Sequence, residues 1–190
     1  GDGCKNMVLA TFGTGVGGGI IVDGKVLHGV HGSGGEIGHL VVNLHETEYC
    51  NCGKKGCVEQ YCSATGIVRM AKQFMEKYDV PSTMRIIDPL TCKDVFACSE
   101  QGDMLASFVL EHVYEYMGMF LSAVCCVVDP EVVVLGGGVS KAGMPLLEGA
   151  KRQFDRHVFH AAKDVRFALA TLGNDAGAYG AFKLVLDEYG

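Results

Sequence analysis

Three closely spaced cysteines are the residues of this sequence best suited to chemistry. Cys50, Cys52 and Cys57 form a Cys-x-Cys-x4-Cys cluster with glycines between the second and third thiols. Thiolates and a neutral imidazole bind Zn²⁺ tetrahedrally, and three thiols with one histidine make a closed, structural set. A lone cysteine is usually a small core residue. A cluster this dense instead predicts a zinc ion that fixes a loop and does not activate a water.

The spacing leaves the fourth ligand of this metal site open. His39, His45 and Cys62 all lie close enough in sequence to complete the set. The Gly38-His39 turn leads into a predicted strand that can fold back, which favours His39. His45 is more typical of a surface loop.

Two carboxylates bracket the cysteines. Glu36 lies in a Glu-x-x-His pair with His39, and Glu59 follows the third cysteine. A carboxylate accepts several hydroxyl hydrogen bonds, which suits a sugar. We therefore interpret Gly32 to Ser63 as a zinc-pinned loop that binds a small hydroxylated ligand. Solvated surface charges and a glycosidase carboxylate pair are the alternatives.

A glycine-rich turn near the start of the chain predicts a phosphate site. Gly13-Thr14-Gly15-Val16-Gly17-Gly18-Gly19 separates two apolar runs, and Asp23-Gly24 is a strong hairpin signal. The dinucleotide fingerprint Gly-x-Gly-x-x-Gly is present, but it requires a following helix, and here a strand follows. No Gly-Lys-Ser/Thr ends a glycine run, which excludes a P-loop. The remaining interpretation is a hairpin whose backbone N–H groups and Thr14 hydroxyl hold phosphate oxygens.

A second glycine turn follows a short apolar run, Val132 to Leu135, that is typical of a central parallel strand. Ligands of α/β folds bind at the carboxyl ends of such strands. We therefore expect the turn to approach a nucleotide base or ribose, through Gly136, Gly137 and Gly138.

The pattern of the whole chain predicts an α/β layered domain that positions these groups. Ser63 is a plausible N-cap for one helix, and Asp129-Pro130 ends the longest one. The expected strands are 6–11, 20–22, 25–28, 40–42, 132–135 and 165–171, and the expected helices are 64–78, 91–99, 102–128, 146–158 and 176–188.

Composition narrows the function classes. The 190 residues are 48% hydrophobic with a net charge of -6, which argues against nucleic acid as the main partner. The most apolar region is interrupted by charged residues and proline, so no membrane span or membrane partner is expected. No signal peptide is expected at the start. The nine cysteines fit reduced thiols plus one metal cluster, hence a cytoplasmic protein, better than a disulfide scaffold.

Six motifs, in matching order and spacing, give the chain a resemblance to a known family. Together they resemble the ROK (repressor, open reading frame, kinase) family, and within it the bacterial glucokinases; the motifs are TFGTGVGGGI, GGEIGHL, CNCGKKGCVEQ, SATGIVRMA, VVVLGGGVS and LGNDAG. The resemblance implies an actin-like, ribonuclease-H-like ATPase domain with an inserted zinc loop and additional helices. It also implies phosphorylation of glucose to glucose 6-phosphate with ATP and Mg²⁺, in a homodimer or larger homo-oligomer.

The same resemblance implies a role for each site residue. Glu36, His39 and Glu59 would bind the sugar, with His39 also on zinc. Thr14 and Gly15 would hold ATP phosphates, and Gly136 to Gly138 would line the adenosine. The implied zinc ligands are His39, Cys50, Cys52 and Cys57.

The family's Asp-x-Gly-Gly-Thr and Asn-Asp-Ala-Asn motifs are not found in this sequence, and the second carries the catalytic base. Asp2 does not match that base. We therefore expect residues 1–190 to be a single carboxyl-terminal domain whose amino-terminal partner domain lies outside this chain. The alternatives are the sugar-sensing domain of a ROK repressor, a ROK kinase for another hexose such as an N-acetylhexosamine, and a zinc-stabilised domain without a ligand.

Overall fold

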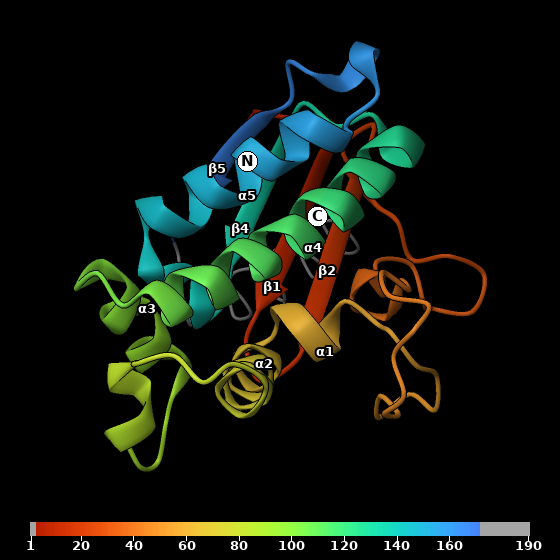
Figure 1. Cartoon of the computed structure of the whole chain (residues 1–190). Coiled ribbons are helices and arrows are strands. Elements are labelled where there is room, and N and C mark those ends of the chain that lie inside the picture. Colours follow the sequence, from red (N-terminus) through yellow and green to blue (C-terminus); the bar gives the residue numbers. More distant parts are fainter. Residues whose placement is uncertain (1–2, 172–190) are drawn as a thin grey trace.

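The computed structural model describes residues 3–171, which form one mixed sheet with helices packed against it (Figure 1). The strands lie in the order β3-β2-β1-β4-β5. Their bounds are β1 Met7–Phe12, β2 Val16–Val22, β3 Lys25–Val26, β4 Val132–Gly136 and β5 Arg166–Leu169. The α-helices are α1 Glu59–Cys62, α2 Ala64–Lys77, α3 Cys92–Glu100, α4 Met104–Val128 and α5 Met144–His157. Short 3-10 helices span Ile37–His39, Thr83–Ile86, Val139–Ala142 and His160–Ala162.

The sheet combines a hairpin with parallel strands. β1 pairs antiparallel with β2 and parallel with β4, which in turn is parallel to β5. All five residues of β4 are buried, as its continuous apolar run predicts for an internal parallel strand. The parallel pairing matters for function because it puts the carboxyl ends of β1 and β4 at one edge of the sheet.

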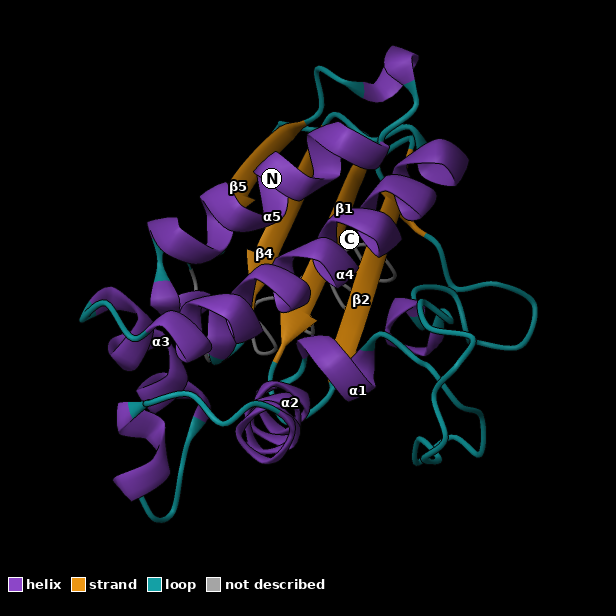
Figure 2. Cartoon of the chain, viewed as in Figure 1, coloured by secondary structure: helices purple, strands orange, loops and turns teal. Residues whose placement is uncertain are grey.

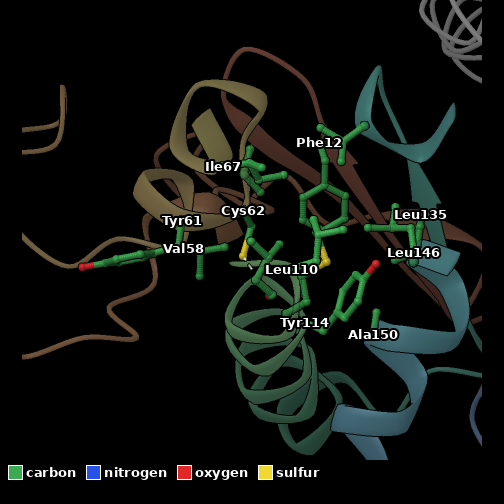
Figure 3. Packing of buried hydrophobic residues seen from close by; sticks show 14 of the residues in the cluster. Phe12, Val58, Tyr61, Cys62, Ile67, Leu110, Tyr114, Leu135, Leu146 and Ala150 are labelled. Carbon is green, nitrogen blue, oxygen red and sulfur yellow. Dashed lines mark hydrogen bonds between the residues drawn. The ribbon is translucent and has the colours of Figure 1, made fainter. Parts of the chain in front are cut away.

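Helix α4 is the centre of the hydrophobic core. Its amino-terminus is capped by Asp103, which accepts hydrogen bonds from the N–H groups of Leu105 and Ala106, and it ends at Asp129 in the left-handed conformation. Helices α4 and α5 lie across one face of the sheet (Figure 2). Figure 3 shows α4 between two groups of buried side chains, one including Val58 and Cys62 and the other including Leu135 and Leu146. The helix thereby joins the sheet to the segment around α1.

Two glycines let α4 and α5 approach closely. A Cβ on Gly118 of α4 would lie 2.5 Å from the backbone carbon of Gln153 and 2.6 Å from the nitrogen of Phe154. A Cβ on Gly149 of α5 would lie 2.5 Å from the ring of Tyr114. Backbone atoms cannot yield as a flexible side chain can, so Gly118 is the more demanding position.

Replacing Gly118 with alanine is expected to destabilise the protein. Helix propensity alone favours alanine by about 1 kcal/mol, but forcing a methyl into packed backbone costs roughly 1–3 kcal/mol. A urea unfolding curve measures whether the free energy of unfolding rises or falls. The control is Ala123→Gly at an exposed position of the same helix, where only propensity acts, so a loss of about 1 kcal/mol is expected. A Gly118→Ala variant more stable than the parent would contradict the close contact.

Most of the expected elements form within one to three residues of their predicted ends. Ser63 caps α2 by accepting a hydrogen bond from the N–H of Gly66, as predicted. The predicted strand at 40–42 is wrong, because Val41 forms only an isolated bridge with Cys57. The return strand after Asp23-Gly24 is shorter than predicted and ends at Val26. The predicted helix at 176–188 lies outside the described residues.

Candidate active site and metal centre

The structure gathers one histidine and three cysteines into a single cluster. The ligand atoms of His39, Cys50, Cys52 and Cys57 all lie within 4.8 Å of one another. The Sγ atoms of Cys52 and Cys57 are 3.6 Å apart, and the Sγ of Cys50 is 3.9 Å from Nδ1 of His39. A tetrahedral zinc site with Zn–S bonds of about 2.3 Å has sulfur–sulfur edges of about 3.8 Å. The donor set and its dimensions therefore fit Zn²⁺.

Local backbone geometry explains why these four residues meet. The N–H of Gly53 bonds the carbonyl of Cys50, and the N–H of Cys50 bonds the carbonyl of Lys54, which closes a tight turn around Cys52. Gly53 has a φ of 84°, a conformation that glycine adopts without strain. The bridge between Val41 and Cys57 returns the chain to the 3-10 turn that carries His39.

The thiols differ in their surroundings. Burial, together with hydrogen bonding to its neighbouring thiols, raises the pKa of Cys57 to about 12. Burial also raises the pKa of Cys50, whereas the backbone N–H of Lys54 lowers the pKa of the exposed Cys52. Metal ligation requires thiolates, so zinc would displace protons from the two buried thiols on binding.

The other two candidates for the fourth ligand lie elsewhere. Cys62 is fully buried in the hydrophobic core, with its Sγ 3.8 Å from the carbonyl of Val113. His45 is an exposed loop residue and is not a member of the cluster. The geometry thus favours His39, which sequence spacing alone left open.

His39 faces two ways. Its Nδ1 lies toward Cys50, and its Nε2 is 4.0 Å from a carboxylate oxygen of Glu36. The Glu36 side chain is 64% exposed and the His39 side chain 31%. One ring nitrogen can therefore bind a metal while the other remains available to a ligand beside Glu36.

Glu59 lies between the metal cluster and the glycine hairpin. It is the first residue of α1, its Oε2 accepts the N–H of Val16 at 3.0 Å, and its Oε1 is 3.7 Å from the Sγ of Cys50. A Cβ on Gly15 would lie 2.2 Å from this Oε2, so a larger residue at position 15 would displace the Glu59 carboxylate from its present position.

The predicted phosphate hairpin is attached to the start of α2. The carbonyl of Thr14 accepts the Thr65 hydroxyl at 2.9 Å, and the carbonyl of Gly13 accepts the N–H of Ala64. Thr14 and Glu59 line a common pocket of about 360 Å³, which Glu36 and His39 do not line. The residues around it are Thr14, Glu48, Tyr49, Cys50, Asn51, Glu59, Gln60, Thr65, Gly66 and Arg69.

The second glycine turn lies beside the hairpin. Gly136 ends β4, and Gly137 has a φ of 84° with its α-carbon so close to Phe12 that an added Cβ would lie 2.4 Å from the Phe12 carbonyl oxygen. Gly137 and Gly138 are exposed. The two glycine turns therefore lie together where β1 and β4 both end, which is where α/β sheets bind their ligands.

Seven of the ten pocket residues were not recognised as site residues from the sequence, and three of these make the contacts that hold the pocket together. Thr65 bonds to the hairpin, and Gln60 and Arg69 bond to residues 39–57, which carry the four metal-ligand candidates and are called the metal loop below. Gln and Arg on a helix are ordinary solvated residues, so their types carry no signal. Only the position of Gln60 directly after Glu59 could have directed attention to it.

The comparison with known proteins decides the family. The ROK family profile matches residues 1–188. The chain belongs to the ROK family. Its mixed α/β fold matches that of the actin-like ROK sugar kinases. None of the helices between residues 3 and 171 combines the length and apolar character that a bilayer crossing needs.

Individual ROK proteins resemble this chain in sequence and in structure. A glucokinase of Halalkalibacterium halodurans is 44% identical over 99% of this chain and 58% of its own length. An N-acetylmannosamine kinase of Escherichia coli is 32% identical over 93% of this chain and 55% of its own length. The structure of a ROK glucokinase from Streptomyces griseus, in complex with glucose and AMPPNP, matches 96% of this chain and 61% of that chain, with a TM-score of 0.86 and 30% identity. The chain thus spans about 60% of the length of these glucokinases.

Proposed function

We propose that this chain supplies the sugar-binding and phosphate-binding part of an ATP-dependent ROK glucokinase, which converts glucose to glucose 6-phosphate. The observation that carries the proposal is the position of Glu59, which contacts both the hairpin at Val16 and the metal cluster at Cys50. In this proposal, the Glu59 carboxylate binds sugar hydroxyls and the neighbouring hairpin binds the phosphates, so the two reacting groups lie side by side. The identity of 44% to a glucokinase supports glucose as the sugar.

Each group has a role in this proposal. Zinc on His39, Cys50, Cys52 and Cys57 is structural, since a closed set leaves no position for a reacting water. Glu36, His39 and Glu59 accept and donate hydrogen bonds to sugar hydroxyls. The hairpin at Thr14 and Gly15 holds ATP phosphates, and the turn at Gly136 to Gly138 lies along the adenosine. When bound, Mg²⁺ would neutralise charge on the phosphates.

The catalytic base is not among these residues. Phosphoryl transfer depends on positioning and electrostatics together with a residue that takes the hydroxyl proton. We propose that an Asp of an amino-terminal domain outside this chain supplies it, which the partial coverage of the relatives supports. A cytoplasmic homodimer or larger homo-oligomer is part of the same proposal, and light scattering tests the oligomeric state.

A kinase assay of the full-length protein tests the proposal. Glucose, N-acetylglucosamine and N-acetylmannosamine are compared with ATP and Mg²⁺ by detection of ADP, and the highest kcat/KM is expected for glucose. The isolated 190 residues are expected to be inactive. A higher kcat/KM for an N-acetylated hexosamine would assign a different ROK kinase. No phosphorylation, with DNA binding that responds to sugar, would assign a repressor.

Glu59→Gln is expected to lower kcat/KM for glucose by about 10- to 100-fold, because hydrogen bonds to a charged acceptor are lost while the side-chain shape is kept. Glu76→Gln, at an exposed position of α2, is the matched control and should leave the kinetics unchanged. Unchanged kinetics in Glu59→Gln would remove Glu59 from the sugar site.

A further inference from the structure

Arg69 of α2 makes the most extensive ionic contacts in the described part of the chain. Its Nη2 donates to Oε2 of Glu46 at 2.7 Å and to the carbonyl of Gln60 at 3.2 Å, and its Nη1 donates to Oε2 of Glu48 at 3.0 Å. The side chains of Arg69 and Glu46 are only 22% and 9% exposed. By contrast, Arg152 and Glu111 form a pair in which both side chains are about half exposed, at 54% and 46%.

Glu46 is held from several directions. Its carboxylate accepts the Tyr61 hydroxyl, the guanidinium of Arg69 and the backbone N–H groups of Thr47 and Glu48. Burial opposes ionisation, but the hydrogen bonds from Arg69 and Tyr61 outweigh it and lower the pKa of Glu46 to about 2. The carboxylate is therefore fixed and charged at neutral pH.

Tyr61 connects this carboxylate to the core. Its ring stacks on Tyr116 of α4, with the centroids 4.3 Å apart, and its hydroxyl also accepts the side-chain amide of Asn43 at 2.9 Å. Figure 3 shows the Tyr61 hydroxyl pointing away from the packed side chains, toward the loop. Both ends of the segment 43–46 are thus bound to one aromatic side chain.

Gln60 completes the attachment. Its side-chain oxygen accepts the N–H groups of Gly56 and Cys57, and its amide donates to the carbonyl of Glu48. Arg69 in turn donates to the backbone carbonyl of Gln60. Segments on both sides of the cysteine turn are therefore tied to the residue that follows Glu59.

The metal cluster cannot provide this attachment. Its four ligands lie between His39 and Cys57, before α1 begins, so a bound ion links the loop to itself and not to α2. Within residues 40–58 the backbone forms β-type pairs at two isolated bridges, Val41 with Cys57 and Tyr49 with Lys55. A loop with so little regular structure needs side-chain contacts to keep one position relative to the helices.

We propose that Arg69 is a positioning residue that clamps residues 46–48 of the metal loop onto α1 and α2. The clamp thereby fixes the positions of Glu59 and the metal cluster relative to the bound sugar. The proposal rests on the proposed function for the identity of the ligand. It predicts that Arg69 affects sugar affinity more than turnover, because it touches the loop and lies outside the phosphate hairpin.

The test uses the full-length protein with Arg69→Met, Arg69→Lys and the control Arg152→Met. Arg69→Met is expected to raise KM for glucose by about tenfold with kcat nearly unchanged, because it loosens the loop and leaves the phosphate groups in place. Amide hydrogen exchange in residues 43–50 should speed up, while zinc content stays at one ion per chain. Arg69→Lys should recover part of the affinity, since it restores the charge without the planar fork. Arg152→Met should change neither the KM for glucose nor the amide exchange in residues 43–50.

A second variant covers the case in which Arg69→Met fails to fold. Glu46→Gln keeps the volume and hydrogen-bonding shape of the acceptor and removes its charge, so a smaller rise in KM and in exchange is expected. Unchanged KM and unchanged exchange in residues 43–50 would overturn the clamp. A fall in kcat alone, with KM unchanged, would do so as well.

The two proposals fail in different ways. A protein that phosphorylates no sugar refutes the proposed function, yet exchange in residues 43–50 of Arg69→Met still tests the clamp. If the protein is an active glucokinase but Arg69→Met changes neither the KM for glucose nor the amide exchange in residues 43–50, the clamp alone is refuted.

Discussion

Replacing Cys57 with serine is expected to weaken zinc binding by about 100-fold and, in metal-free protein, to abolish sugar binding, while the sheet stays folded. Structural zinc sites bind with roughly 10–16 kcal/mol, so one of four ligands accounts for about 3 kcal/mol, or about a 100-fold loss of zinc affinity. A serine hydroxyl does not ionise at neutral pH and is a poor replacement for a thiolate. Competition with a zinc-chelating dye measures the affinity, and far-ultraviolet circular dichroism reports whether the helices persist.

Two further variants separate ligation from packing. Cys57 is buried and Cys52 is exposed, so Cys52→Ser should lose zinc to a similar extent if both act as ligands. Cys126, an exposed cysteine outside the cluster, is the control, and Cys126→Ser should keep zinc and sugar affinity. A metal-free Cys57→Ser protein that binds glucose normally would refute the metal centre as the support of the sugar loop.

Replacing Phe120 with alanine is expected to cost about 3–5 kcal/mol of folding free energy, as large-to-small changes at buried aromatic residues do. Phe120 is 1% exposed and packs edge-on against Phe12, with the ring centroids 6.1 Å apart. Because single domains are stable by only about 5–15 kcal/mol, the melting temperature should fall by roughly 6–20 °C. Thermal unfolding followed by circular dichroism measures the shift.

The same helix offers a matched control. Phe108 is 42% exposed and contacts aromatic side chains at the surface, so Phe108→Ala should cost clearly less than Phe120→Ala. Equal losses would mean that α4 is not packed as described. Since Phe12 directly precedes the predicted phosphate hairpin, the structure also links core packing at Phe120 to the position of Thr14.

Local signals in the sequence predicted much of the fold. A capping serine, an Asp-Pro pair and a continuous apolar run predicted the start of α2, the end of α4 and strand β4, because each acts over a few neighbouring residues. The prediction of a strand at 40–42 failed for the opposite reason. An apolar run becomes a strand only if a partner backbone pairs with it, and here Cys57 pairs with a single residue.

By itself, the sequence predicted a metal site at the cysteine cluster and ligand sites at the two glycine turns, since residue type and spacing limit what such groups can bind. The sequence ranked His39 first among the candidates for the fourth ligand, and the tertiary structure brings His39, and not His45, next to the cysteines. Only the tertiary structure decided that Glu59 lies between cluster and hairpin, and that Arg69 attaches the loop to α2. Contacts between residues distant in sequence depend on how strands and helices pack, and no local pattern encodes that packing.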